Sequence, residues 1–97
     1  MLTENEILEI AKKYIALIEK ESKIEIVLID KKIAKKSYGT IFFYTSKKWL
    51  ETGDDRYAIA GNAPFLIESE TGNIIEFGTA HMPNYYIEEY EAGRWPK

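Results

Sequence analysis

Few side chains in this chain of 97 residues are of the types that perform covalent or acid–base chemistry. The chain has no cysteine, which excludes disulfides, thiolate metal sites and cysteine nucleophiles. Its single histidine, His81, could act beside a carboxylate, but a lone histidine between a strand end and a helix start is more typical of an exposed loop. Asp54 and Asp55 form too short a cluster for a calcium loop, and no carboxylate pair is singled out by its spacing. The sequence therefore predicts no catalytic residue, no metal site, no cofactor and no enzyme.

Glycines raise the separate question of a phosphate-binding loop in the stretch AGNAPFLIESETGNIIEFGTA, residues 60–80. Such loops need clustered glycines that open directly onto a helix N-terminus, so that backbone N–H groups converge on the anion. Here strand-like apolar runs separate Gly61, Gly72 and Gly78, which favours a β-hairpin with a three-residue turn and Gly72 at positive φ. Asn62 is expected to bond to nearby backbone and fix the entry turn, with ligand contact as the alternative.

Charge is divided unevenly along the chain, whose net charge is −3. Residues 1–48 contain 10 lysines and 7 carboxylates, whereas residues 49–97 contain 3 basic residues and 9 carboxylates. The acidic half is either an ordinary solvated face or an electrostatic docking surface for a basic partner.

The carboxylates of the acidic half gather in two segments, a loop after Trp49 and the last predicted helix. If the two segments lie side by side, they present one negative surface beside Trp49, and tryptophan is a common interface anchor. Partial burial in the core is the alternative for Trp49 and for Trp95. The candidate partner-binding residues are Trp49, Glu51, Asp54, Asp55, Glu88 and Glu91.

Four lysines at positions 31, 32, 35 and 36 form the main basic cluster. No aromatic residues are interleaved with them and no nucleic-acid motif surrounds them, so they are better explained as protection of a strand edge or turn. No apolar run approaches the roughly 20 residues of a membrane span, and charges interrupt the N-terminal segment where a signal peptide would need an apolar run. We therefore expect a soluble, cytoplasmic protein that binds neither nucleic acid nor membrane.

The first expected element is an amphipathic helix over residues 4–21. Thr3 and Glu6 have the spacing of a capping box, which predicts that the helix begins directly after Thr3. Apolar residues then recur at helical spacing, which predicts one buried face. That face comprises Ile7, Ile10, Ala11, Tyr14, Leu17 and Ile18.

The remaining pattern predicts a single α+β domain over residues 1–97. Strands are expected at 24–29 and 40–45, paired antiparallel, and in the hairpin of residues 63–77. Residues 30–36 are typical of a turn or a ragged strand end, residues 46–51 of one helical turn, and Pro83 of the first turn of a short helix ending near Gly93. One apolar face of the four-stranded, mainly antiparallel sheet should be covered by helices. The expected core is Ile7, Ile10, Tyr14, Ile18, Ile26, Leu28, Phe43, Phe65, Ile67, Ile75, Tyr86 and Tyr90.

Several landmarks occur in a familiar order and spacing between residues 37 and 91. They are WLETGD at 49–54, AGNAPF at 60–65, Thr71-Gly72, GTA at 78–80, Tyr86 and Tyr90-Glu91. Together they resemble the immunity protein 35 family, also called YrhB-type proteins. The resemblance implies a small bacterial cytosolic protein, not an enzyme, that neutralises a cognate toxin of a polymorphic or contact-dependent system. One branch of the family is chaperone-like, so a small holdase is the alternative.

Overall fold

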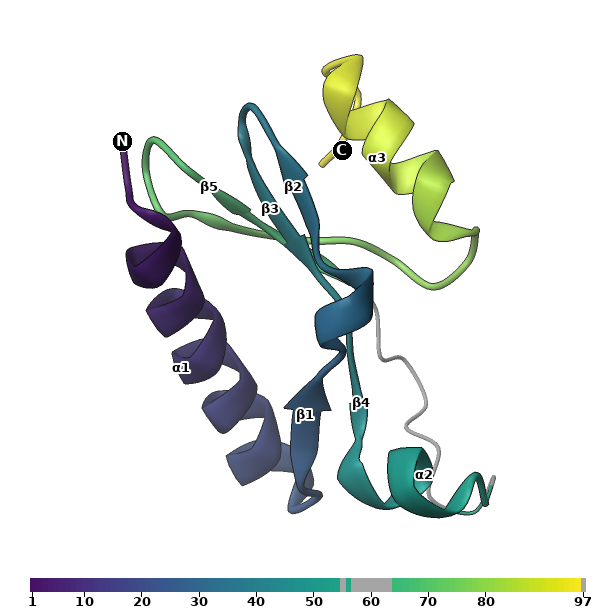
Figure 1. The fold of residues 1–97 in the computed structure, drawn as a ribbon. Coiled ribbons are helices and arrows are strands. Elements are labelled where there is room, and N and C mark those ends of the chain that lie inside the picture. Colours follow the sequence, from purple (N-terminus) through teal and green to yellow (C-terminus); the bar gives the residue numbers. More distant parts are fainter. Residues whose placement is uncertain (55, 57–63, 97) are drawn as a thin grey trace.

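The computed structural model describes residues 1–54, 56 and 64–96 and confirms the predicted α+β class (Figure 1). Its elements are α1 (Glu4–Ser22), β1 (Ile26–Leu28), the 3-10 turn η1 (Asp30–Lys32), β2 (Ala34–Lys36), β3 (Gly39–Phe42), β4 (Tyr44–Ser46), α2 (Lys47–Thr52), β5 (Phe65–Glu68), β6 (Ile74–Glu76) and α3 (Pro83–Glu91). No helix in these described ranges is long and apolar enough to cross a membrane. Gly61 and Asn62, for which we expected a turn, lie outside the described residues.

Helix α1 begins at the predicted capping box. The Glu6 amide donates to the Thr3 hydroxyl (3.2 Å), and the Thr3 amide donates to the Glu6 carboxylate (2.9 Å). These two bonds satisfy backbone groups that have no partner within the helix. The helix ends at Lys23, which adopts a left-handed conformation with φ 59° and donates its amide to the Glu19 carbonyl.

The buried face of α1 is rotated from the one we predicted. Ile7 and Ala11 are buried as expected, but the third buried residue is Ile15, which the prediction omitted. Leu17 was also expected on this face, and that prediction is wrong because the residue is 61% exposed. The face therefore follows the i, i+4, i+8 row, whose residues lie along one line of the helix.

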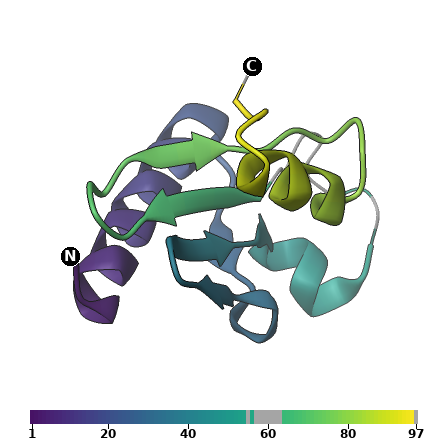
Figure 2. The ribbon, with the colours of Figure 1, turned by 90° about the horizontal axis from the view of Figure 1, so that it is seen from above.

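The strands form two antiparallel sheets rather than one. Strand β1 pairs with β4, with Val27 opposite Thr45, which confirms the pairing expected for these segments. The second sheet has four strands in the order β2-β3-β5-β6, which Figure 2 shows from above. Phe43 separates β3 from β4, and η1 separates β1 from β2. The extra residues of η1 interrupt what is otherwise one long hairpin, still linked by the bond from the Ile29 amide to the Phe43 carbonyl (2.8 Å).

Both faces of the four-stranded sheet are covered, which corrects the expectation of one covered face. Strand side chains alternate between faces, so the opposed pair Phe42 and Phe65 packs in the cluster under α1. The next pair, Ile41 and Leu66, packs in a second cluster with Tyr86 of α3. Figure 1 shows α1 and α3 on opposite sides of the strands. Burial on both faces is reflected in β5, where the successive apolar residues Phe65, Leu66 and Ile67 are all buried.

All of the expected core residues belong to these two clusters or pack against them, although not all are fully buried. Ile7, Ile26, Phe65, Ile67 and Tyr86 are buried. The others are partly buried and pack against the clusters: Ile10, Tyr14, Ile18, Leu28, Phe43, Ile75 and Tyr90.

The hairpin of β5 and β6 confirms the conformation predicted for Gly72, whose φ is 78°. Its amide donates to the Glu68 carbonyl (2.8 Å), and the Glu68 amide donates to the Asn73 carbonyl (2.9 Å). The connection thus runs over residues 69–72, one residue longer than expected. At its tip, the Ser69 carbonyl accepts from the Leu2 amide (2.7 Å), so the start of the chain is joined to this hairpin.

Helix α3 begins at Pro83 as predicted and is followed by Gly93 at φ 76°. Its buried residue Tyr86 packs against the ring of Trp95, with centroids 5.0 Å apart. The Trp95 indole N–H donates to the Glu76 carbonyl on the outer edge of β6 (3.1 Å). Trp95 therefore both packs on α3 and covers a strand edge.

Candidate functional site

The first group of predicted partner-binding residues lies on α2 and just after it. Ser46 caps this helix by accepting from the Trp49 amide (3.1 Å), and Gly53 ends it at φ 67°. Trp49 is half-buried, whereas Glu51 is exposed. The helical turn predicted at 46–51 is therefore confirmed, and Glu51 projects where a partner can reach it.

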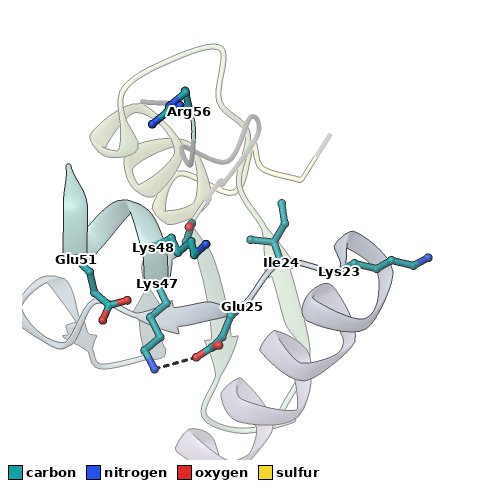
Figure 3. A pocket seen from close by; sticks show the side chains of 8 residues that line it. Lys23, Ile24, Glu25, Lys47, Lys48, Glu51 and Arg56 are labelled. Atoms are coloured by element: carbon teal, nitrogen blue, oxygen red, sulfur yellow. Dashed lines mark ion pairs between the residues drawn. The ribbon is translucent and has the colours of Figure 1, made fainter. Parts of the chain in front are cut away.

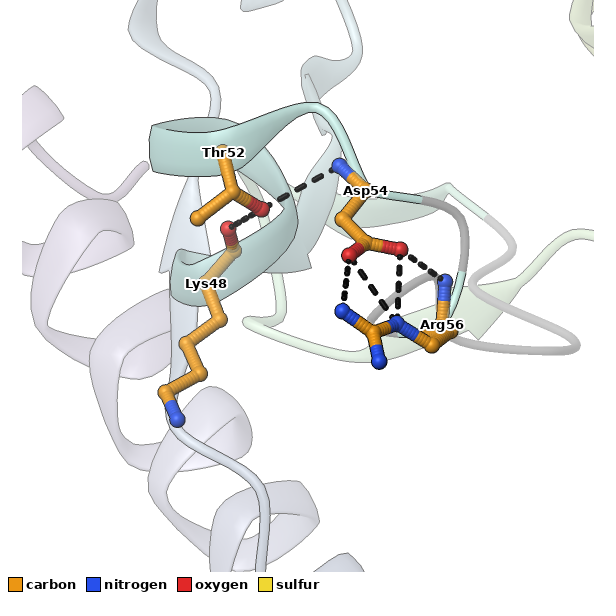
Figure 4. A network of polar contacts seen from close by, with 4 residues as sticks. All are labelled: Lys48, Thr52, Asp54 and Arg56. Atoms are coloured by element: carbon orange, nitrogen blue, oxygen red, sulfur yellow. Dashed lines mark hydrogen bonds and ion pairs between the residues drawn. The ribbon is translucent and has the colours of Figure 1, made fainter.

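Asp54 is engaged by a neighbouring arginine (Figure 4). Its carboxylate accepts from the Arg56 amide (3.0 Å) and side chain, and the closest guanidinium contact is 2.6 Å. These hydrogen bonds from Arg56 hold the pKa of Asp54 below its usual value. The Asp54 amide donates to the Thr52 hydroxyl, which donates to the Lys48 carbonyl. Asp54 thus contributes to the local fold of this loop, and Asp55 lies outside the described residues.

A cavity of about 410 Å³ lies where the end of α1 meets the start of α2 (Figure 3). The charged side chains in its lining are Lys23, Glu25, Lys47, Lys48, Glu51 and Arg56. Lys47 and Glu25 form an ion pair at 3.0 Å, and the bond to Glu25 raises the pKa of Lys47. Basic groups outnumber carboxylates in this lining, so the surface at α2 is mixed in charge rather than negative.

The second predicted group lies on α3. Glu88 is exposed, and Glu91 accepts a hydrogen bond from the Tyr38 hydroxyl (2.6 Å). Between them, Glu89 forms an ion pair with Arg94 (2.5 Å). Figure 1 places α2 and α3 at opposite ends of the molecule. The structure therefore does not bring the two groups together, and the single negative surface expected beside Trp49 is not formed.

His81 lies in the loop before α3 and is exposed, as the sequence indicated. Its ring lies 4.0 Å from that of Tyr85, and its amide donates to the Tyr86 hydroxyl (3.2 Å). Within the described ranges, no group of three or more His, Cys, Asp or Glu residues is placed to hold a metal ion.

The lysine cluster is found at an edge of the four-stranded sheet. Lys35 and Lys36 belong to β2, the edge strand, and Lys35 forms an ion pair with Glu4 (2.9 Å). Lys31 and Lys32 lie in η1. This placement matches the role in protecting an edge or turn that we predicted.

Sequence reasoning missed a cluster of tyrosines and carboxylates at the end of the sheet nearest α3. The Tyr90 hydroxyl donates to the Glu68 carboxylate (2.5 Å), and the Tyr90 and Tyr38 rings lie 5.0 Å apart. Tyr90 was expected in the core, and no role was predicted for Tyr38. These residues are far apart in the sequence, so no local pattern predicts the cluster. Only the folded sheet brings them together.

Comparisons with known proteins agree with the resemblance. The family model described as Immunity protein 35 matches residues 6–93. A curated relative from Escherichia coli (strain K12), "Uncharacterized protein YrhB", is 42% identical over 55 residues, which cover 57% of this chain and 58% of that protein. The match therefore spans less than two thirds of that relative. No solved structure is significantly similar to the chain. Because the family model matches most of the sequence, from α1 to the end of α3, the chain belongs to the immunity protein 35 family.

Proposed function

We propose that this protein neutralises a cognate protein toxin of a bacterial polymorphic or contact-dependent system by binding it stoichiometrically in the cytoplasm. The observation that carries the proposal is the family match over residues 6–93, which spans both sheets and α3. Neutralisation by occlusion needs a complementary surface and no reaction at the immunity protein.

The fold supports such a role because its sheet is buried on both faces. Phe65, Leu66 and Ile67 of β5 are fully buried, which fixes the central hairpin between α1 and α3. A rigid surface loses little conformational entropy on binding, so more of the contact energy is available for affinity.

The predicted contact residues now divide into two separate surfaces. One is at α2, with Trp49, Glu51 and Asp54, and the other is at α3, with Glu88 and Glu91. We propose the α3 end as the toxin-binding surface, because α2 is surrounded by lysines and Asp54 is paired with Arg56. A surface with excess carboxylates would steer a basic toxin during association.

The proposal is tested by expressing each open reading frame adjacent to this gene in a bacterial host, with and without this protein. We expect growth to be restored only when both are present, and light scattering to show a complex with fixed stoichiometry. Protection at substoichiometric amounts, or a covalently altered toxin, would contradict occlusion and indicate catalysis.

The alternative, a chaperone-like holdase, requires an exposed apolar surface for many clients. Among the described residues the exposed large apolar side chains lie on different segments: Met1 before α1, Leu17 on α1, Ile24 before β1, Leu50 on α2 and Met82 before α3. This dispersion favours the immunity role. Suppression of heat-induced aggregation of several unrelated proteins, measured by light scattering, would favour the holdase.

A further inference from the structure

A second cavity, of about 280 Å³, lies at the end of the molecule opposite α2. It is formed by the turn between β2 and β3, the tip of the β5–β6 hairpin and the last part of α3. Its lining residues are Ser37, Tyr38, Glu68, Glu70, Thr71 and Tyr90. Three segments far apart in the sequence therefore meet around one small cavity.

The tyrosines of this cavity are fixed by the carboxylates beside them. Tyr90 donates to Glu68 (2.5 Å), and Tyr38 donates to Glu91 (2.6 Å). Thr71 donates to the other oxygen of Glu68 (3.3 Å). Burial and the Glu68 carboxylate raise the pKa of Tyr90 to about 12, so this hydroxyl remains a donor at neutral pH. The walls of the cavity are consequently ordered before any ligand arrives.

The charge of the cavity is negative. Its lining contains Glu68 and Glu70 and, over the described residues, no basic side chain. Lys36 lies opposite Gly39, which lies opposite Glu68, so the side chains of Lys36 and Glu68 are on the same face of the sheet. Their backbones are two strands, or about 10 Å, apart. Arg94 is paired with Glu89. A ligand that complements the cavity must therefore bring positive charge.

The tyrosine rings define how such a cation can lie. Their centroids are 5.0 Å apart with planes tilted by 42°, so the rings contact each other and leave no room for a group between them. A cation must instead lie against the exposed side of a ring, close to the carboxylates. Contact with the face of a tyrosine and with a carboxylate is favourable for ammonium and guanidinium groups alike.

We propose that this cavity receives one lysine or arginine side chain from the surface of the protein partner. The nature of that partner as a toxin rests on the function proposed above, whereas the affinity of the cavity for a cationic side chain does not. A cation held by a carboxylate and an aromatic ring in a preformed cavity is the kind of contact that dominates the affinity of an interface.

The test uses a single cationic side chain, Nα-acetyl-arginine methylamide, titrated into isotopically labelled protein and followed by NMR. Nα-acetyl-citrulline methylamide is the control ligand, because its side chain has nearly the same shape but no charge. We expect the arginine compound to shift the backbone amides of Tyr38, Glu70, Thr71 and Tyr90 in a salt-dependent manner, and citrulline to leave them unshifted.

Two variants assign the binding to the carboxylates. Glu70→Gln and Glu68→Gln are each expected to weaken arginine binding about tenfold, because a charge-assisted bond becomes a neutral one. Glu51→Gln at α2 is the matched control and should leave binding unchanged. The amide spectrum of each free variant checks that the fold is retained, and Glu70 is exposed with no role in the core.

The proposal is overturned if citrulline binds as well as arginine, if the shifts occur at the α2 cavity, or if both cavity variants bind normally. Because the titration needs no toxin, it tests cation binding at the cavity independently of toxin neutralisation. Arginine binding without protection of cells would refute the immunity role alone. Protection without arginine binding at this cavity would refute the present proposal alone.

Discussion

Gly72 shows how one residue governs the hairpin between α1 and α3. Gly72 and Gly53 have similar left-handed conformations, with φ 78° and 67°. A Cβ at Gly72 would lie 3.2 Å from side-chain atoms of Leu2 and Ile10, whereas a Cβ at Gly53 would meet nothing within 4 Å. The two positions therefore share the backbone constraint and differ in crowding.

Valine at either glycine is expected to lower the free energy of unfolding by about 1 kcal/mol or more, because left-handed conformations are unfavourable for branched residues. Gly72→Val should cost more than Gly53→Val, since only Gly72 is crowded. Urea unfolding of both variants measures the difference. Equal losses would show that Leu2 and Ile10 move aside without cost.

A second prediction at the residue scale concerns pH and Glu6. The hydrogen bonds from the Thr3 amide and hydroxyl lower the pKa of Glu6 from its usual value in the folded state. A carboxylate with a lowered folded pKa contributes stability above its unfolded pKa, and this contribution is lost as the pH falls through the folded value. The stability difference between wild type and Glu6→Gln should therefore shrink on acidification.

Urea unfolding at neutral and acidic pH measures this difference. The same substitution in a Thr3→Ala background isolates the contribution of the hydroxyl, because the backbone amide of residue 3, the larger cause of the lowered pKa, is retained. A difference that is independent of pH would contradict the assigned cause.

At the scale of elements, α1 allows a direct test of its corrected face. Ile15 is 6% exposed and Leu17 is 61% exposed, although only one residue separates them. Ile15→Ala should lower the free energy of unfolding by about 2–5 kcal/mol, as for other large apolar residues removed from a core. Leu17→Ala should change it by less than about 0.5 kcal/mol. If urea unfolding shows comparable losses of stability for both variants, the corrected face is wrong and Leu17 belongs to the buried face, as predicted from the sequence.

The elements that sequence predicted well are those fixed by local chemistry. The capping box at Thr3, the proline at the start of α3 and the glycine of the β5–β6 turn each act within a few residues, and all three are confirmed. The division of residues 40–45 into β3 and β4 was not predicted. It accompanies the separation of the partner strands β1 and β2 by η1, because β4 pairs with β1 whereas β3 pairs with β2.

The candidate site was predictable only in its parts. The helical turn carrying Trp49 and Glu51 follows from local sequence, but the cavity beside it also draws Lys23 and Glu25 from the end of α1. The pairing of Tyr90 with Glu68 spans 22 residues and depends on the position of α3 over the sheet. Distances between elements are set by the sheet, and no local pattern encodes them.

On the scale of the whole molecule, charge reversals at the α3 end and at α2 should affect binding differently. We predict that the double reversal Glu70→Lys and Glu88→Lys at the α3 end slows association with the toxin, and that Glu51→Lys at α2 does not. The effect should weaken with added salt, because charges are screened over about 8 Å at physiological ionic strength. Surface charges contribute little to stability, so the melting temperatures should remain nearly unchanged.

Stopped-flow association at two salt concentrations measures these rates. If the α2 variant slows association and the α3 variant does not, the toxin binds at the mixed surface of Figure 3 instead. If neither variant slows association, the acidic half of the chain is an ordinary solvated surface.

The contact between α1 and β5 has a consequence for folding during synthesis. Helix α1 is synthesised before β5, yet its apolar face packs against Phe65 and Ile67, and Leu2 bonds to Ser69. This face of the helix therefore stays incompletely covered until β5 has been synthesised, and α3 follows β5 in the sequence. A nascent chain that ends before β5 should consequently expose the apolar face of α1 to solvent and to chaperones, whereas a chain that includes β5 can bury it.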